Sequence, residues 1–232
     1  MQGKTIVVTG AFGALGSVVA ETAAKRGASV ALVDHAEAAP AGLAERLGAN
    51  ALLVGGVDLA SLPAAETAIA SVKAKFGRVD ALINIAGGFQ WDTIADGKVD
   101  SWDRMYAINL KTALNASKAA LPHLMESGAG RIVNVGAQSA LDAASGFGPY
   151  AASKSAVHRL TESLADELKL KGVTVNAVMP SIIDTAANRR DMPKADFSRW
   201  VAPADLAAVI LFLASDAAKA VTGALIPVSG QV

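Results

Sequence analysis

Two residues that could exchange a proton with a substrate, Tyr150 and Lys154, lie four positions apart in the segment YAASK. The segment begins a strong helical pattern, so both side chains are expected on one helix face, about one turn apart. A tyrosine hydroxyl has a pKa of about 10, and a nearby ammonium group favours the phenolate. The pair is therefore suited to acid–base chemistry, with donors left on the lysine for a ribose. The same spacing also arises by chance on exposed helices.

A second group of residues, the glycines Gly10, Gly13 and Gly16, follows an apolar run and opens an alanine-rich helical pattern. Glycine lets the backbone turn sharply and approach a pyrophosphate, and the free N–H groups at a helix start favour its charge. The loop, with Phe12 and Leu15, therefore predicts a dinucleotide site. Its spacing departs from the usual fingerprint, and a plain strand-to-helix turn is the alternative.

An acid at the end of the next apolar run, Asp34, lies 18 residues after Gly16. In dinucleotide-binding domains, an acidic residue about 20 residues after the glycine loop accepts hydrogen bonds from the adenosine ribose. Its charge would repel a 2′-phosphate, and Ala11 and Phe12 stand where an arginine would hold one. The sequence predicts NAD(H) as cofactor, with NADP(H) less favoured. For Asp34 itself, a helix cap or a solvated turn is the alternative.

Short apolar runs alternate with longer helical patterns along the whole chain. The runs are continuous rather than alternating in polarity, which is typical of a parallel sheet with helices on both faces. We therefore predict one α/β domain over residues 1–232, with a doubly wound parallel sheet. The longest helical patterns cover residues 101–127 and 150–171, and residues 180–202 form one long irregular stretch. The predicted strands are residues 5–9, 29–34, 51–54, 81–85, 131–135, 173–178 and 225–228.

The composition excludes several classes of function. Lys plus Arg and Asp plus Glu both number 21, which gives no general attraction for nucleic acid or an anionic membrane. The absence of cysteine excludes thiol nucleophiles and thiolate metal sites, and the three histidines share no metal-ligand spacing. We expect His123 and His158 on helix surfaces, no metal site, and a small-molecule substrate. With no signal sequence and no run of ~20 apolar residues, the chain is predicted to be cytoplasmic.

Together these motifs resemble the short-chain dehydrogenase/reductase family over essentially the whole chain. TGAFGALG stands where the family has TGxxxGxG. Asp58 in VDL, NIAG at residues 84–87, Asn109 in INL, YAASK, and PSIIDT at residues 180–185 follow in family order. The resemblance implies a Rossmann-type fold and hydride transfer to or from a nicotinamide cofactor.

The resemblance also implies a role for each matching residue. Tyr150 would exchange the substrate proton, Lys154 would bind the nicotinamide ribose, and Asn109 would organise the water chain of a proton relay. Asp58 would border the adenine. The implied cofactor contacts are Gly10, Phe12, Gly13, Leu15, Gly16, Asp34, Asp58, Leu59, Asn84, Ala86, Gly87, Tyr150, Lys154, Pro180, Ile183 and Thr185.

Two positions depart from the family pattern: Ala14 replaces the middle glycine of the loop, and Ala137 stands in place of the substrate-orienting serine. GALG, AGGF at residues 86–89 and the spacing from GAQSALD to Tyr150 resemble the dihydropteridine reductases, which also lack that serine and favour NADH. Ser139 would project from the same face as Ala137, ~7 Å further along, if the backbone is extended. It is either a substrate contact or a polar loop residue.

Phe89 and Trp91 flank the expected substrate pocket, where a flat quinonoid dihydropterin could stack on either ring, or where both simply pack the loop. The leading prediction is an NADH-dependent reductase of a small conjugated C=O or C=N acceptor. A ketone or 3-oxoacyl thioester reductase is the runner-up, and a non-catalytic NAD-binding redox sensor is a third reading. Family resemblance also implies a homodimer or homotetramer, paired through the two long helices.

Overall fold

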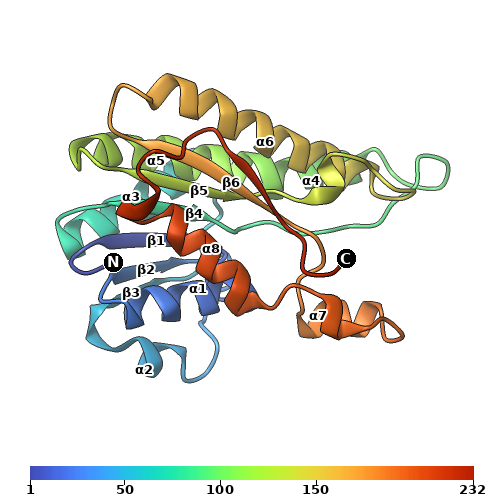
Figure 1. The fold of residues 1–232 in the computed structure, drawn as a ribbon, viewed down its shortest axis with the longest axis horizontal. Coiled ribbons are helices and arrows are strands. Elements are labelled where there is room, and N and C mark those ends of the chain that lie inside the picture. Colours follow the sequence, from blue (N-terminus) through green and yellow to red (C-terminus); the bar gives the residue numbers. More distant parts are fainter.

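The computed structural model describes residues 1–232, and its centre is a sheet of seven parallel strands (Figure 1). The strand order is β3-β2-β1-β4-β5-β6-β7, so the winding direction reverses between β1 and β4. This confirms the predicted doubly wound α/β fold. The strands are β1 (Thr5–Thr9), β2 (Ser29–Val33), β3 (Ala51–Val54), β4 (Ala81–Asn84), β5 (Arg131–Val135), β6 (Thr174–Pro180) and β7 (Leu225–Val228).

Helices cover both faces of the sheet (Figure 1). One face packs on α1 (Ala14–Lys25), α2 (Leu43–Leu47) and α8 (Pro203–Leu213), and the other on α3 (Leu62–Phe76), α5 (Thr112–Glu126) and α6 (Gly148–Leu168). Within β1, Ile6 and Val8 belong to the first hydrophobic cluster while Val7 belongs to the second. Because alternate side chains are buried on opposite faces, the strand needs an unbroken apolar sequence.

The segment predicted as one helix over residues 101–127 is divided into three parts. It begins with α4 (Asp100–Met105), widens into a π-helical turn at Tyr106–Lys111, and continues as α5. Hydrophobic periodicity does not distinguish a π-helical turn from the α-helix around it, so the sequence prediction was wrong at this point.

The prediction of one irregular stretch over residues 180–202 was also wrong in part. This stretch contains α7 (Ala186–Asp191) and a 3₁₀ turn at Phe197–Arg199. Both are short and begin at a polar cap: the Thr185 hydroxyl accepts a hydrogen bond from the Asn188 N–H, and the Asp196 carboxylate accepts one from the Ser198 N–H. Capping therefore creates helical structure where the hydrophobic pattern predicts none.

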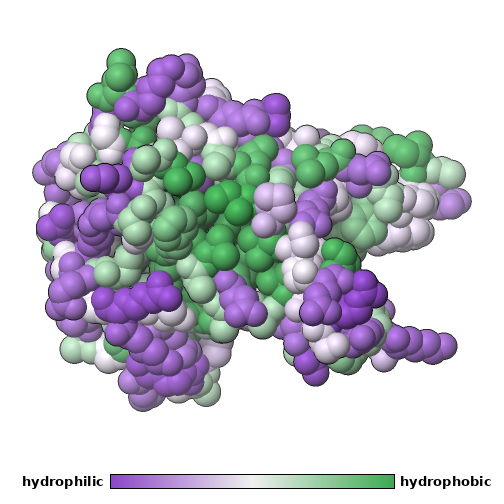
Figure 2. Space-filling model, viewed as in Figure 1, coloured by the Kyte–Doolittle hydropathy of each residue, from purple (hydrophilic) through white to green (hydrophobic).

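The surface in the same view shows an apolar area and a notch (Figure 2). Hydrophobic residues gather in the middle of Figure 2, over α8 and the edge strand β7, where Phe212 is exposed. To the right, a notch separates the loops that follow β4 and β5 from α7 (Figure 2). None of the helices has the length and apolar character required to cross a lipid bilayer.

Candidate active site

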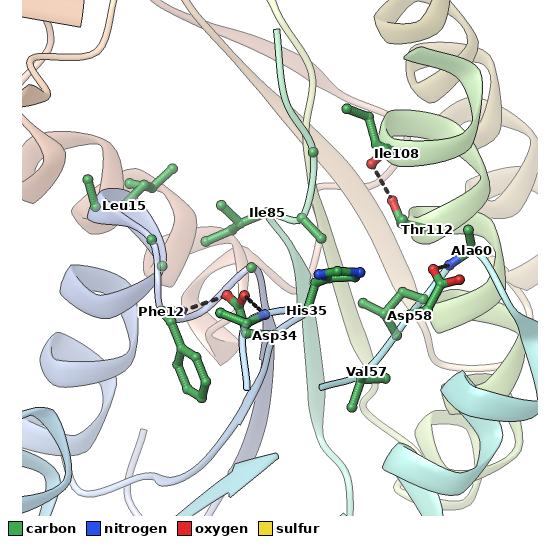
Figure 3. Close-up of a pocket in the computed structure, with 18 of the residues that line it drawn as sticks. Phe12, Leu15, Asp34, His35, Val57, Asp58, Ala60, Ile85, Ile108 and Thr112 are labelled. Carbon is green, nitrogen blue, oxygen red and sulfur yellow. Dashed lines mark hydrogen bonds between the residues drawn. The ribbon is translucent and has the colours of Figure 1, made fainter. Parts of the chain in front are cut away.

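A cavity of about 630 Å³ lies at the carboxyl ends of β1 to β4, where the strand order reverses (Figure 3). Ligands of open α/β sheets bind at this position. The cavity is lined by the glycine loop, the end of β2, the loop after β3 and the exit of β4. Its lining residues are Gly10, Phe12, Gly13, Ala14, Leu15, Gly16, Asp34, His35, Ala36, Val57, Asp58, Leu59, Ala60, Ile85, Ala86, Gly87, Ile108, Thr112 and Thr185.

The glycine loop folds so tightly that two of its positions have no room for a side chain. A Cβ at Gly16 would lie 2.2 Å from the carbonyl oxygen of Gly10, and a Cβ at Gly10 would lie 2.8 Å from the backbone of Ala86. Gly10 also has a φ of +62°, which favours glycine. Helix α1 begins directly after Gly13, at Ala14, so its first N–H groups lie beside the cavity. The loop is therefore a backbone cradle suited to an anionic group.

Asp34 connects the end of β2 to this loop. One carboxylate oxygen accepts a hydrogen bond from the Phe12 N–H at 2.8 Å, and the other accepts one from the Ala36 N–H at 2.9 Å. The residue thus holds a turn rather than a helix end, and it also lines the cavity (Figure 3). His35 points into the cavity between Asp34 and Asp58 (Figure 3).

A second cavity, of about 430 Å³, lies between the exit of β5, the first turns of α6 and the α7 segment. Two aromatic rings surround the Tyr150 ring: Phe89 at 5.0 Å and Phe147 at 6.5 Å between centroids, both edge-to-face. The wall is mainly apolar, and Lys154 is its only charged member. The lining residues are Phe89, Val135, Gly136, Ala137, Ser139, Phe147, Tyr150, Lys154, Pro180, Ser181, Ile182, Ile183, Asn188 and Met192.

Of the predicted catalytic residues, Tyr150 and Lys154 line the second cavity, and Lys154 and Asn109 both approach Gly87, which lines the first. Asn109 is buried in the π-helical turn, and its amide donates to the Gly88 carbonyl and the Ser153 hydroxyl, each at 3.0 Å. A Cβ at Gly87 would lie 2.4 Å from the Asn109 Oδ1 and 3.5 Å from the Lys154 Nζ. A side chain at position 87 would therefore displace the Asn109 amide from its hydrogen bonds to Gly88.

Burial governs the acid–base properties of the pair. It raises the pKa of the Tyr150 phenol to about 12 and lowers the pKa of the Lys154 ammonium to about 8. The sequence expectation that the lysine brings the phenol pKa down is wrong for the protein chain by itself, because desolvation dominates. The Lys154 Nζ instead donates to the carbonyl of Val135 at 2.7 Å. At neutral pH the phenol is protonated, which suits a proton donor.

Three predicted site residues line neither cavity: Asn109, described above, and the predicted contacts Asn84 and Trp91. The Asn84 amide donates in the core to the Ser117 hydroxyl at 3.1 Å and to the Asn134 Oδ1 at 2.9 Å. Trp91 is exposed, and its indole donates to the carbonyl of Ser145. The other predicted cofactor and substrate residues line one cavity or the other.

Several lining residues were not among the predicted contacts. His35, Val57, Ile85, Ile108 and Thr112 line the first cavity. Phe147, Ser181 and Met192 line the second. Four of them closely follow the end of a strand, namely His35, Val57, Ile85 and Ser181, so for these proximity to the carboxyl edge of the sheet was the available signal. The other four lie on helices or on loops far from a strand end, and no sequence signal marked them.

His158 is buried, with 1% of its surface exposed, although it was expected on a helix surface. It lies one turn after Lys154 on the inner face of α6, and its Nε2 accepts a hydrogen bond from the Ala137 N–H at 3.4 Å. Burial, followed by the charges of Arg159 and Lys154, lowers its pKa from 6.5 to about 4. The expectation that His123 lies on a helix surface is confirmed, because His123 is partly exposed on α5 near Glu126.

This buried histidine predicts a loss of stability in mild acid. Between pH 6.5 and about 4 the unfolded chain binds a proton at His158 that the folded protein does not. The free energy of unfolding should therefore fall as the pH drops, by roughly 2 kcal/mol at pH 5 from this group. The free energy of unfolding is measured by urea titration of wild type and His158→Leu at pH 7 and at pH 5. An equal loss in both proteins would contradict the prediction.

A doubly wound sheet, a backbone cradle at its reversal point and a tyrosine–lysine pair beside it define a Rossmann-type oxidoreductase. A family model described as short chain dehydrogenase matches residues 4–196. The chain belongs to the short-chain dehydrogenase family and is an oxidoreductase of that family.

Individual relatives span nearly the whole chain. It is 34% identical to D-threitol dehydrogenase of Mycolicibacterium smegmatis, over 99% of this chain and 93% of the relative. It is 33% identical to 3-oxoacyl-[acyl-carrier-protein] reductase of Salmonella typhimurium, over 99% and 97%. The crystal structure of 3-ketoacyl-(acyl-carrier-protein) reductase from Brucella melitensis complexed with NADH superposes with a TM-score of 0.88 at 28% identity, covering 100% of this chain and 99% of that one.

Proposed function

We propose that this protein is an NADH-dependent reductase of a small, uncharged, conjugated C=O or C=N acceptor, similar to the dihydropteridine reductases. The observation that carries the proposal is the Tyr150 ring between Phe89 and Phe147, one helix turn before Lys154, in the wall of a mainly apolar cavity. Lys154 also approaches Gly87, which lines the glycine-loop cavity. NADH supplies the hydride when it is bound. Tyr150 donates the proton to the acceptor, and Asn109 and Lys154 hold the groups around it.

The first cavity fits a dinucleotide in size and lining. Its volume of about 630 Å³ lies within the ordinary range for ligand pockets, and the close approach of Gly16 to Gly10 leaves backbone free to meet a pyrophosphate. Asp34 would accept hydrogen bonds from the adenosine ribose, and Asp58 would border the adenine. A relative with the same fold is described as a complex with NADH, which supports this cofactor.

The lining of the second cavity favours a flat, neutral acceptor. Phe89, Phe147 and the Tyr150 ring supply aromatic faces and edges, and Ala137 offers a methyl group where the family pattern has a hydroxyl. A quinonoid dihydropterin fits these surfaces by stacking and hydrogen bonding. The second candidate is a 3-oxoacyl thioester, because the relatives from Salmonella and Brucella are described as reductases of that class.

A panel of acceptors tests this proposal. Quinonoid dihydropterin, a quinone, a diketone and a 3-oxoacyl thioester are each assayed with NADH and with NADPH at pH 7. We expect the dihydropterin with NADH to give the highest kcat/KM. Preference for the thioester would replace the proposed acceptor by the second candidate. Failure with every acceptor, despite NADH binding, would favour the non-catalytic redox sensor.

Replacement of Asp34 by Ser should weaken the preference for NADH over NADPH. The substitution removes a charge that repels a 2′-phosphate and weakens hydrogen bonds to the ribose, each worth ~1.5–3 kcal/mol. We expect the ratio of the NADPH Kd to the NADH Kd, measured by fluorescence titration, to fall at least tenfold. Because Asp34 also accepts from the Phe12 N–H, thermal unfolding is followed in parallel. Asp166→Ser, on the exposed face of α6, is the matched control. Equal NADH and NADPH affinity in the wild type would contradict this role.

We also propose a homodimer or homotetramer paired through the long helices. Tyr106 in the π-helical turn and Leu114 on α5 are large, apolar and exposed in the single chain, 51% and 38% respectively. Light scattering at micromolar concentration should give two or four times 23.5 kDa. Leu114→Glu should lower that mass, whereas Leu170→Glu, at an exposed position after α6, should not. A monomeric wild type would contradict the assembly.

A further inference from the structure

The tyrosine-bearing helix holds the exit of β5 at two points on either side of Gly136. Before Gly136, the Lys154 Nζ donates to the Val135 carbonyl at 2.7 Å. After Gly136, the Ala137 N–H donates to the Nε2 of His158 at 3.4 Å. Because Lys154 and His158 are four residues apart, they lie on the same face of α6. The two contacts therefore hold both sides of one backbone turn.

The turn has no space to move toward the helix. A Cβ at Gly136 would lie 2.3 Å from the His158 Nε2, so the imidazole rests directly on the backbone there. On the other side, the Gly136 N–H donates to the Val178 carbonyl of β6 at 2.8 Å. The imidazole is neutral at pH 7, and the bond from Ala137 requires that its Nε2 carry no proton.

The turn leads directly into the acceptor cavity. Val135, Gly136, Ala137 and Ser139 all line that cavity, as do Phe89, Phe147 and Tyr150. A shift of this backbone would move Ala137 and Ser139 relative to the Tyr150 hydroxyl while leaving the glycine loop in place. Misplacement of a substrate by about 1 Å can cost two orders of magnitude in rate.

We infer that His158 is a positioning residue for the acceptor: by accepting the Ala137 N–H it sets where the β5 exit places an acceptor relative to Tyr150. This inference rests on the proposed reductase activity. His158 lines neither cavity, so it acts on the acceptor only through the backbone of Gly136 and Ala137. The glycine loop that would bind NADH is not part of this contact. The acceptor kcat/KM should therefore depend on His158, and the NADH Kd should not.

His158→Leu fills the space without offering an acceptor, and His158→Gln offers an amide oxygen in its place. For the best acceptor of the panel at pH 7, we expect His158→Leu to lower kcat/KM at least tenfold with the NADH Kd within twofold of wild type. His158→Gln should recover most of the loss. Wild-type kcat/KM in His158→Leu, a parallel loss of NADH affinity, or no recovery in His158→Gln would each overturn the inference. If His158→Leu does not fold, His158→Met takes its place.

Hydrogen exchange tests the geometry without any acceptor. The backbone amides of residues 135–140 should exchange at least fivefold faster in His158→Leu than in wild type, while residues 10–16 of the glycine loop stay unchanged. Unchanged exchange at residues 135–140 would overturn the inference even in an active enzyme. A wild type that reduces no acceptor, yet shows this change on substitution, would remove the proposed function and leave the backbone contact standing.

Discussion

Tyr150→Phe is expected to lower the turnover of the proposed reduction by ~10²–10⁴, the usual contribution of a positioned acid–base group. The substitution removes the hydroxyl that is proposed to donate the proton and keeps the ring that packs edge-to-face against Phe89 and Phe147. The fold and the NADH Kd should therefore stay close to wild type, so that kcat falls while cofactor binding does not.

The chain supplies its own control for this experiment, because its only other tyrosine, Tyr106, is exposed and lines neither cavity. Tyr106→Phe should retain wild-type turnover. Steady-state rates with the best acceptor and fluorescence titration with NADH are measured for both variants. Full activity of Tyr150→Phe with every accepted substrate would defeat the proton-transfer role and leave only the cofactor-binding proposal.

Lys154→Met should reduce both turnover and cofactor affinity, which distinguishes it from Tyr150→Phe. Methionine fills a similar volume but cannot donate, so the Val135 carbonyl loses its 2.7 Å partner and the proposed ribose contact is lost as well. A hydrogen bond from a charged group is worth ~1.5–3 kcal/mol, or about 10- to 100-fold in the NADH Kd. Turnover should fall at least as far.

Lys118→Met, at an exposed position on α5, is the matched control for the loss of a lysine charge. The NADH Kd is measured by titration and turnover by NADH oxidation. An unchanged Kd in Lys154→Met, with turnover reduced, would confine Lys154 to the proton transfer and contradict its ribose contact.

Much of the fold follows from sequence pattern alone. Strands β1, β3, β5 and β7 have the predicted bounds, because continuous apolar runs between helical patterns are specific to a sheet covered on both faces. Most predicted site residues line the two cavities. This was predictable because the carboxyl ends of adjacent parallel strands meet at one edge of the sheet.

The differences between the sequence expectations and the structure concern what a side chain contacts in space rather than where it lies in the chain. His158 and Asn84 are polar residues in good helical or strand patterns, and only tertiary packing decides that one supports Ala137 and the other joins Ser117 and Asn134. The phenol pKa of Tyr150 was misjudged because spacing shows a neighbouring lysine but not the loss of water. Trp91 lies near the site in sequence and turns outward to the carbonyl of Ser145.

The π-helical turn at Tyr106–Lys111 combines a less favourable backbone with the position of Asn109, the residue proposed for the proton relay. A π-helical turn holds one residue more than the α-helix it interrupts, and it is the less favourable backbone. Loss of a single residue there would restore a regular helix and rotate Asn109 away from Gly88 and Ser153. A shortened chain could therefore gain stability and lose its site at once.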